Sequence, residues 1–175
     1  YMGYFFPMDA MAINLVAIAS ILFLTVINCF GIKIGAAIQN IFTLTKIGAL
    51  LVLAVLSFAL SGGSVSNFSP LLPSLPFTSL TGPLLLAMIA VLWSYDGWIE
   101  ITYVAGEVIE PQRNLPRSLA IGTFIVILMY IVISSAVMYV LPIESAANSQ
   151  LVLSDTAVKI LGSGGAIFIS IAVVI

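Results

Sequence analysis

Long stretches without a charged side chain are the feature that most constrains how this sequence can fold. The first lies between Asp9 and Lys33, and similar stretches recur along the 175 residues. A helix of about 20 residues rises about 30 Å, which matches the hydrocarbon core of a bilayer. With 62% of its residues hydrophobic and 7% charged, the chain has more apolar surface than a soluble domain of this length can bury. We therefore predict an all-α integral membrane protein.

Glycines, prolines and charged residues divide the chain into about five spans, which we take as one transmembrane domain over residues 1–175. The predicted helices cover about residues 11–30, 41–60, 83–109, 116–141 and 156–175, and the third is broken at 94–97. The last helix stops inside an apolar run. We therefore expect the sequence to be an internal piece of a longer protein.

The positive charges predict how the chain crosses the membrane. Lys33, Lys46, Arg113 and Arg117 fall on one side of the alternating topology, and Lys and Arg favour the cytoplasm. The segments predicted to be external are residues 1–9, 61–81 and 143–155. The second of these segments contains a glycosylation triplet, Asn67-Phe68-Ser69. The prediction is a multi-pass protein of the inner or plasma membrane.

Five residues, Ser94-Tyr95-Asp96-Gly97-Trp98, interrupt the third span. A helix in lipid pairs its backbone groups internally, so a break is best accommodated where it lines a cavity. Broken helices at this depth hold the substrate in secondary transporters. The alternative is structural, with two aromatic side chains wedged between helices beside a glycine that permits close packing.

Several classes of function are disfavoured. The sequence has no histidine and one cysteine, Cys29, and it shows no nucleophile–base pair, metal-ligand cluster or phosphate-binding loop. We therefore predict no enzyme activity, no cofactor and no metal. A net charge of −2 gives no indication of a nucleic-acid partner. A channel or pore subunit, and a structural membrane subunit that transports nothing, remain the alternatives to a transporter.

Two segments resemble a known family: Trp93–Leu119 (WSYDGWIEITYVAGEVIEPQRNLPRSL) and Ile27–Leu53 (INCFGIKIGAAIQNIFTLTKIGALLVL). Together they resemble the amino acid–polyamine–organocation superfamily, and most of all its L-type amino acid permeases and exchangers. The resemblance implies the leucine-transporter-type fold of two inverted repeats, of which this chain would hold about the fourth to eighth spans. It also implies secondary active transport of amino acids by alternating access, through exchange or proton coupling.

The interrupted span is where the resemblance places the substrate. It implies that the backbone carbonyls of Trp93, Ser94 and Asp96 bind the substrate ammonium, and that Trp93 gates the pocket. The negative end of a helix dipole at this point suits a cation. We take Tyr95, Gly97 and Trp98 as part of the same site. The Asp96 carboxylate has two interpretations: it contacts a cation or carries a proton, or it caps the second helical piece.

Three further charged residues are candidates for coupling or gating. Lys46 either snorkels to the headgroups or, as the resemblance implies, stands in for a sodium ion and ties the spans together, which predicts sodium-independent transport. Glu100 is either a proton carrier or a residue stabilised by the helix dipole beside a wet cavity. Glu107 is a candidate contact of the inner gate, and the alternative is ordinary interfacial charge. The sequence does not identify the amino acid or any partner subunit.

Overall fold

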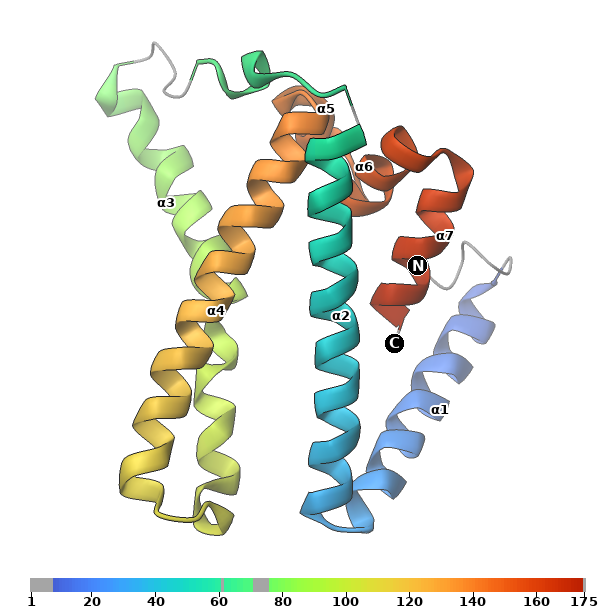
Figure 1. Cartoon of the computed structure of the whole chain (residues 1–175), viewed down its shortest axis with the longest axis vertical. Coiled ribbons are helices and arrows are strands. Elements are labelled where there is room, and N and C mark those ends of the chain that lie inside the picture. Colours follow the sequence, from blue (N-terminus) through green and yellow to red (C-terminus); the bar gives the residue numbers. More distant parts are fainter. Residues whose placement is uncertain (1–7, 61, 71–75, 175) are drawn as a thin grey trace. The chain divides into compact units, whose positions relative to one another are not determined.

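The computed structural model describes residues 8–60, 62–70 and 76–174. The α-helices of this part are α1 (Ala10–Cys29), α2 (Ile32–Leu60), α3 (Phe77–Ser94), α4 (Pro111–Val140), α5 (Ile143–Asn148), α6 (Val152–Leu161) and α7 (Ser163–Val174) (Figure 1). Two 3-10 helices are η2 (Val65–Phe68) and η3 (Asp96–Glu107). Four spans among the described residues, namely α1, α2, α3 with η3, and α4, are long and apolar enough to cross a membrane. The prediction of an all-α membrane protein is confirmed.

The chain divides into two compact units. One unit combines Tyr1–Phe68 with Ile133–Ile175, and the other is the continuous segment Ser69–Val132. The boundary between them falls inside α4, so this one helix contributes residues to both units. We describe each unit separately.

In the first unit, α1 and α2 are joined by a tight turn (Figure 1). The Asp9 carboxylate caps α1 by accepting a hydrogen bond from the Ala12 amide at 2.8 Å. Gly31 makes the turn with a φ of 102°, a value that favours glycine. The second helix then begins at Ile32, well before the predicted start at residue 41. Lys33 therefore belongs to the first turn of α2 and not to a loop. A long cationic side chain at a helix end can reach the headgroups, so it does not have to end the helix.

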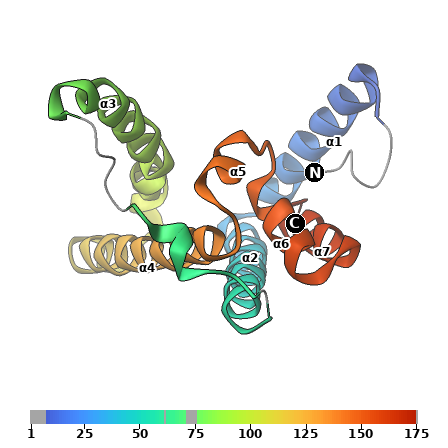
Figure 2. The ribbon, with the colours of Figure 1, turned by 90° about the horizontal axis from the view of Figure 1, so that it is seen from above.

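The core of the first unit lies where α2 meets α6 and α7. Leu53, Ala157 and Ile169 are buried together, and each comes from a different helix. Seen from above, α6 and α7 lie side by side (Figure 2), and they share the most extensive helix–helix contact of the unit. Apolar side chains packed around this centre are Leu153, Ile160 and Phe168. This packing holds the C-terminal half of α2 against α6 and α7.

The structure differs from the prediction over the last part of the chain. An external loop over 143–155 and one helix over 156–175 were predicted, but the structure has three helices, α5, α6 and α7. The chain turns at Gly162, whose φ of 65° and ψ of −152° belong to a backbone region that is open almost only to glycine. A single helix over 156–175 is therefore wrong, because the backbone leaves helical geometry at residue 162.

The second unit contains the third span and the first part of α4. Pro76 takes the N-cap position of α3, so this helix begins before the predicted start at residue 83 and carries Pro83 in its interior. Likewise α4 begins at Pro111 rather than at residue 116. Glu110, with a φ of 48°, turns the chain immediately before it. Proline at the first helical position has a suitable φ and lacks an amide that would have no partner there.

Candidate functional site

The third span changes its type of helix at Tyr95. The α-helix α3 ends at Ser94, and the 3-10 helix η3 begins at Asp96. Between them Tyr95 has a φ of −102° and a ψ of 3°, and its amide donates to the Leu92 carbonyl at 3.1 Å. The span therefore consists of two helical pieces. The interruption is narrower than the predicted 94–97, because the tighter i→i+3 bonds continue the pairing of the backbone, as lipid demands.

A hydroxyl from α4 contacts the last residue of α3. The Tyr130 hydroxyl donates to the Ser94 carbonyl at 3.1 Å. The rings of Tyr95 and Tyr130 lie 5.0 Å apart between centroids, tilted by 51°, which is a favourable aromatic arrangement. One residue of α4 thus contacts both the last residue of α3 and the junction residue that follows it.

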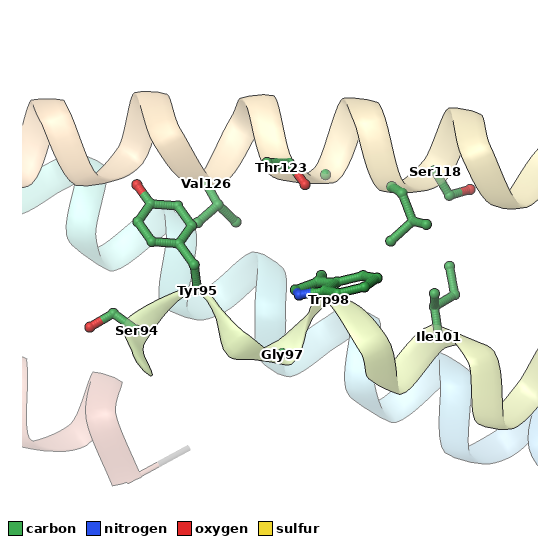
Figure 3. A pocket seen from close by; sticks show the side chains of 10 residues that line it. Ser94, Tyr95, Gly97, Trp98, Ile101, Ser118, Thr123 and Val126 are labelled. Atoms are coloured by element: carbon green, nitrogen blue, oxygen red, sulfur yellow. The ribbon is translucent and has the colours of Figure 1, made fainter. Parts of the chain in front are cut away.

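A cavity of about 300 Å³ lies between η3 and α4 at this junction (Figure 3). Tyr95 and Trp98 extend from the third span towards α4, and Thr123 faces them from α4. The residues that line it are Ser94, Tyr95, Gly97, Trp98, Ile101, Ser118, Leu119, Gly122, Thr123 and Val126. Aromatic walls with a few hydroxyl groups are the usual make-up of a site for a small organic molecule, and the volume is at the lower end of the usual range.

Four of the six residues expected to bind substrate line this cavity: Ser94, Tyr95, Gly97 and Trp98. The other two, Trp93 and Asp96, are not among the lining residues, and Trp93 is 80% exposed. The capping role considered for Asp96 is not observed. Tyr95 holds the N-cap position of η3, and no side chain forms a cap bond there.

The three candidates for coupling and gating are all exposed. Lys46 lies on α2 in the first unit, whereas Glu100 and Glu107 lie on η3 in the second. Within the described part of the chain none of them forms an ion pair; the ion pair that is found there joins Arg113 to Glu110 at 3.7 Å. Both of those side chains are mostly exposed, so the pair contributes little to stability.

The contribution of α4 to the site was not predicted from the sequence. Tyr130 lies in the middle of an apolar span, and a tyrosine hydroxyl in apolar surroundings usually has a hydrogen-bond partner. That residue was therefore a detectable signal. Ser118 and Thr123 were harder to find, because small hydroxyl residues are common wherever membrane helices pack closely.

Comparison with known proteins identifies the family. The family model for amino acid permeases matches residues 2–175. The b(0,+)-type amino acid transporter 1 of Mus musculus is 36% identical over 145 residues, covering 82% of this chain and 29% of that protein. The serine/threonine exchanger SteT of Bacillus subtilis is 32% identical over 164 residues, covering 93% of this chain and 36% of that protein.

A third relative is the large neutral amino acids transporter small subunit 2 of Oryctolagus cuniculus. It is 27% identical over 161 residues, which cover 90% of this chain and 30% of that protein. The chain thus spans about a third of the length of these relatives. The resemblance noted from Trp93–Leu119 and Ile27–Leu53 is confirmed. The chain is a multi-pass membrane protein and belongs to the amino acid permease family.

Proposed function

We propose that this chain is part of a secondary active transporter that carries amino acids across the cell membrane by alternating access. The observation that carries the proposal is the junction at Tyr95, where an α-helix becomes a 3-10 helix beside a cavity. A long 3-10 stretch inside a span is uncommon and marks a point at which the helix can change its winding. Membership of the amino acid permease family supports the choice of substrate class.

The ammonium group of the substrate is proposed to bind at the C-terminal end of α3, at the carbonyls of Trp93, Ser94 and Asp96. The helix dipole is negative at this end, which favours a cation. The Ser94 carbonyl has two lone pairs, so it can accept from the Tyr130 hydroxyl and from an ammonium at the same time. Tyr130 is then a positioning residue that keeps this carbonyl aimed into the site.

The rest of the substrate is proposed to occupy the cavity. Its lining contains hydroxyl and aromatic side chains and no ionised group among the described residues, which favours an uncharged substrate side chain. Trp93 is proposed to act as the gate, following the resemblance, and its exposed position leaves the cavity wall to Trp98. Asp96, Glu100 and Glu107 remain candidates for charge-dependent steps, including proton coupling.

Removing the Tyr130 hydroxyl should weaken substrate binding moderately. A single hydrogen bond contributes about 1 kcal/mol, so Tyr130→Phe should raise the Kd for the amino acid about fivefold while the ring contact with Tyr95 is kept. Binding to the purified full-length protein measures this. Tyr139→Phe is the control, because that tyrosine lies at the C-terminal end of the same helix and does not line the cavity. An equal loss in both variants would argue against a positioning role for Tyr130.

Transport itself is tested with the full-length protein in liposomes. We expect saturable uptake of radiolabelled neutral amino acids that is stimulated by amino acids on the opposite side. A channel would give uptake that does not saturate, and a structural subunit would give none. The name of one relative includes the term small subunit. Uptake should therefore also be measured with and without co-expressed candidate partner subunits.

Uptake should not require sodium. We propose that the Lys46 ammonium replaces a bound sodium ion, so transport in choline buffer should equal transport in sodium buffer. Lys46→Gln should lower uptake about tenfold or more. Without the ammonium, the position that would otherwise hold a sodium ion has no positive charge inside the membrane, which is costly. Lys33→Gln is the matched control, because Lys33 lies in the first turn of the same helix. A sodium requirement, or equal effects of the two substitutions, would contradict the role of Lys46.

A further inference from the structure

The C-terminal end of α4 receives hydrogen bonds from the loop after α2. The Tyr139 carbonyl accepts from the Ser64 amide at 3.0 Å and from the Asn67 side-chain amide at 3.1 Å. The last four carbonyls of an α-helix have no partner within the helix, so they need donors from elsewhere. Asn67 is 72 positions away in the sequence, and it therefore joins η2 to a distant helix end.

A second side chain reaches the next carbonyl from the other direction. The Lys159 ammonium, on α6, donates to the Val140 carbonyl at 2.8 Å, and this bond is partly buried. A cation at a helix C-terminus also interacts favourably with the helix dipole. Three elements, η2, α4 and α6, thus meet at two successive carbonyls of one helix.

The packing around this point is close. The ring of Tyr139 lies 5.3 Å from that of Phe58 at the end of α2, between centroids. A side chain at Gly63 would collide with Tyr139, since its first carbon would lie 2.6 Å from the ring atom Cδ1. Val140 is 1% exposed. The bonds from Asn67 and Lys159 are therefore made in a well-packed setting, where the loss of a donor weakens the hydrogen bonding of a helix-end carbonyl.

We propose that Asn67 and Lys159 form a clasp on the Tyr139 and Val140 carbonyls, and that this clasp controls the turnover of transport without contacting the substrate. The inference rests on the proposed function. α4 is one continuous helix that also bears Tyr130, whose hydroxyl holds the Ser94 carbonyl. While both bonds are closed they hold this helix end in one position, and the transport cycle passes through this clasped state. The clasp also gives the Asn67-Phe68-Ser69 triplet a structural role, in which Asn67 acts as a donor.

Hydrogen–deuterium exchange in the purified full-length protein tests the clasp directly. The Ser64 amide, which donates to Tyr139, and the Leu141 amide, which donates to Val137 at 2.8 Å, report on its opening. Asn67→Asp keeps the shape of the side chain and removes the donor, so Ser64 should exchange about fivefold faster. Lys159→Met removes a charged donor, so Leu141 should exchange about tenfold faster or more.

Two conservative variants serve as controls. Ser69→Ala destroys the glycosylation triplet and leaves Asn67 in place, so it should leave both amides unchanged. Lys159→Arg retains a cationic donor and should restore most of the protection lost in Lys159→Met. Unchanged exchange of both reporter amides in Asn67→Asp and Lys159→Met would overturn the clasp. Equal effects of Ser69→Ala and Asn67→Asp would overturn it too, because the triplet and not the donor would then be responsible.

Transport separates the clasp from the proposed function. In liposomes, Asn67→Asp and Lys159→Met should lower the maximal rate of amino acid transport about fivefold, because the clasped state loses population. The KM for the amino acid should stay the same. A changed KM with an unchanged maximal rate would overturn the role in turnover. The wild-type protein could bind no amino acid while the two variants still changed the hydrogen–deuterium exchange of the reporter amides. The proposed function would then fail and the hydrogen-bonded clasp would stand.

Discussion

Replacing Gly165 with alanine is expected to lower the free energy of unfolding by about 3 kcal/mol, the upper range for an overpacked site. Gly165 lies near the start of α7, where this helix crosses α6. A methyl group there would collide with the Ala157 carbonyl and approach the Val158 amide to 3.1 Å. Ala157 is fully buried. Because the obstacle is backbone, the two helices would have to separate.

The thermal midpoint of the purified full-length protein in detergent measures this effect. Gly164→Ala is the matched control, because the neighbouring glycine has no atom within 4 Å of an added methyl group. That variant should lie within about 0.5 kcal/mol of the wild type. Equal midpoints for the two alanine variants would show that the close crossing of α6 and α7 is absent from the native protein.

Replacing Gly122 with phenylalanine should abolish most amino acid binding. Gly122 lines the cavity between η3 and α4, and nothing lies within 4 Å of a carbon added to it. The first carbon of the new side chain therefore meets no neighbour, and the ring attached to it is expected to occupy the cavity. A cavity of about 300 Å³ holds roughly ten water molecules, so one large side chain takes up much of it. We expect the Kd to rise about a hundredfold, or about 2.8 kcal/mol.

Isothermal titration with the full-length protein measures this change. Gly48→Phe in α2 is the control, since that glycine also has no atom within 4 Å and does not line the cavity. It should bind amino acids as the wild type does. Normal binding by Gly122→Phe, with an unchanged thermal midpoint, would remove the cavity from the site and leave the α3 carbonyls alone as candidates.

Much of the site could be predicted from the residues of the third span. Gly97 and Asp96 are poor choices for a lipid-facing helix, and this mismatch located the junction at which α3 gives way to η3. The sequence could not indicate how the backbone passes Tyr95. An unwound turn and a 3-10 helix satisfy the same composition, and the bond from Tyr130 that holds the junction comes from 36 residues away.

The end of the chain was predicted less well, for a different reason. Glu144 and Asp155 made residues 143–155 look like a polar loop. The structure places them on two short helices, α5 and α6, and the second of these has a polar and an apolar face. Hydropathy measures whether a segment can enter lipid, and it does not detect helices that are too short to span. The turn at Gly162 was equally invisible, because a glycine in an apolar run also suits a straight helix.

The winding of η3 has a consequence for its length. A 3-10 helix rises about 2.0 Å per residue and an α-helix about 1.5 Å, so the 12 residues of η3 would shorten by about 6 Å if they rewound as α-helix. Such a contraction would draw Glu107 towards Tyr95 and rotate the side chains between them about the axis. A rewinding of η3 would thus change the length of the span by roughly one α-helical turn, without bending the span at a hinge.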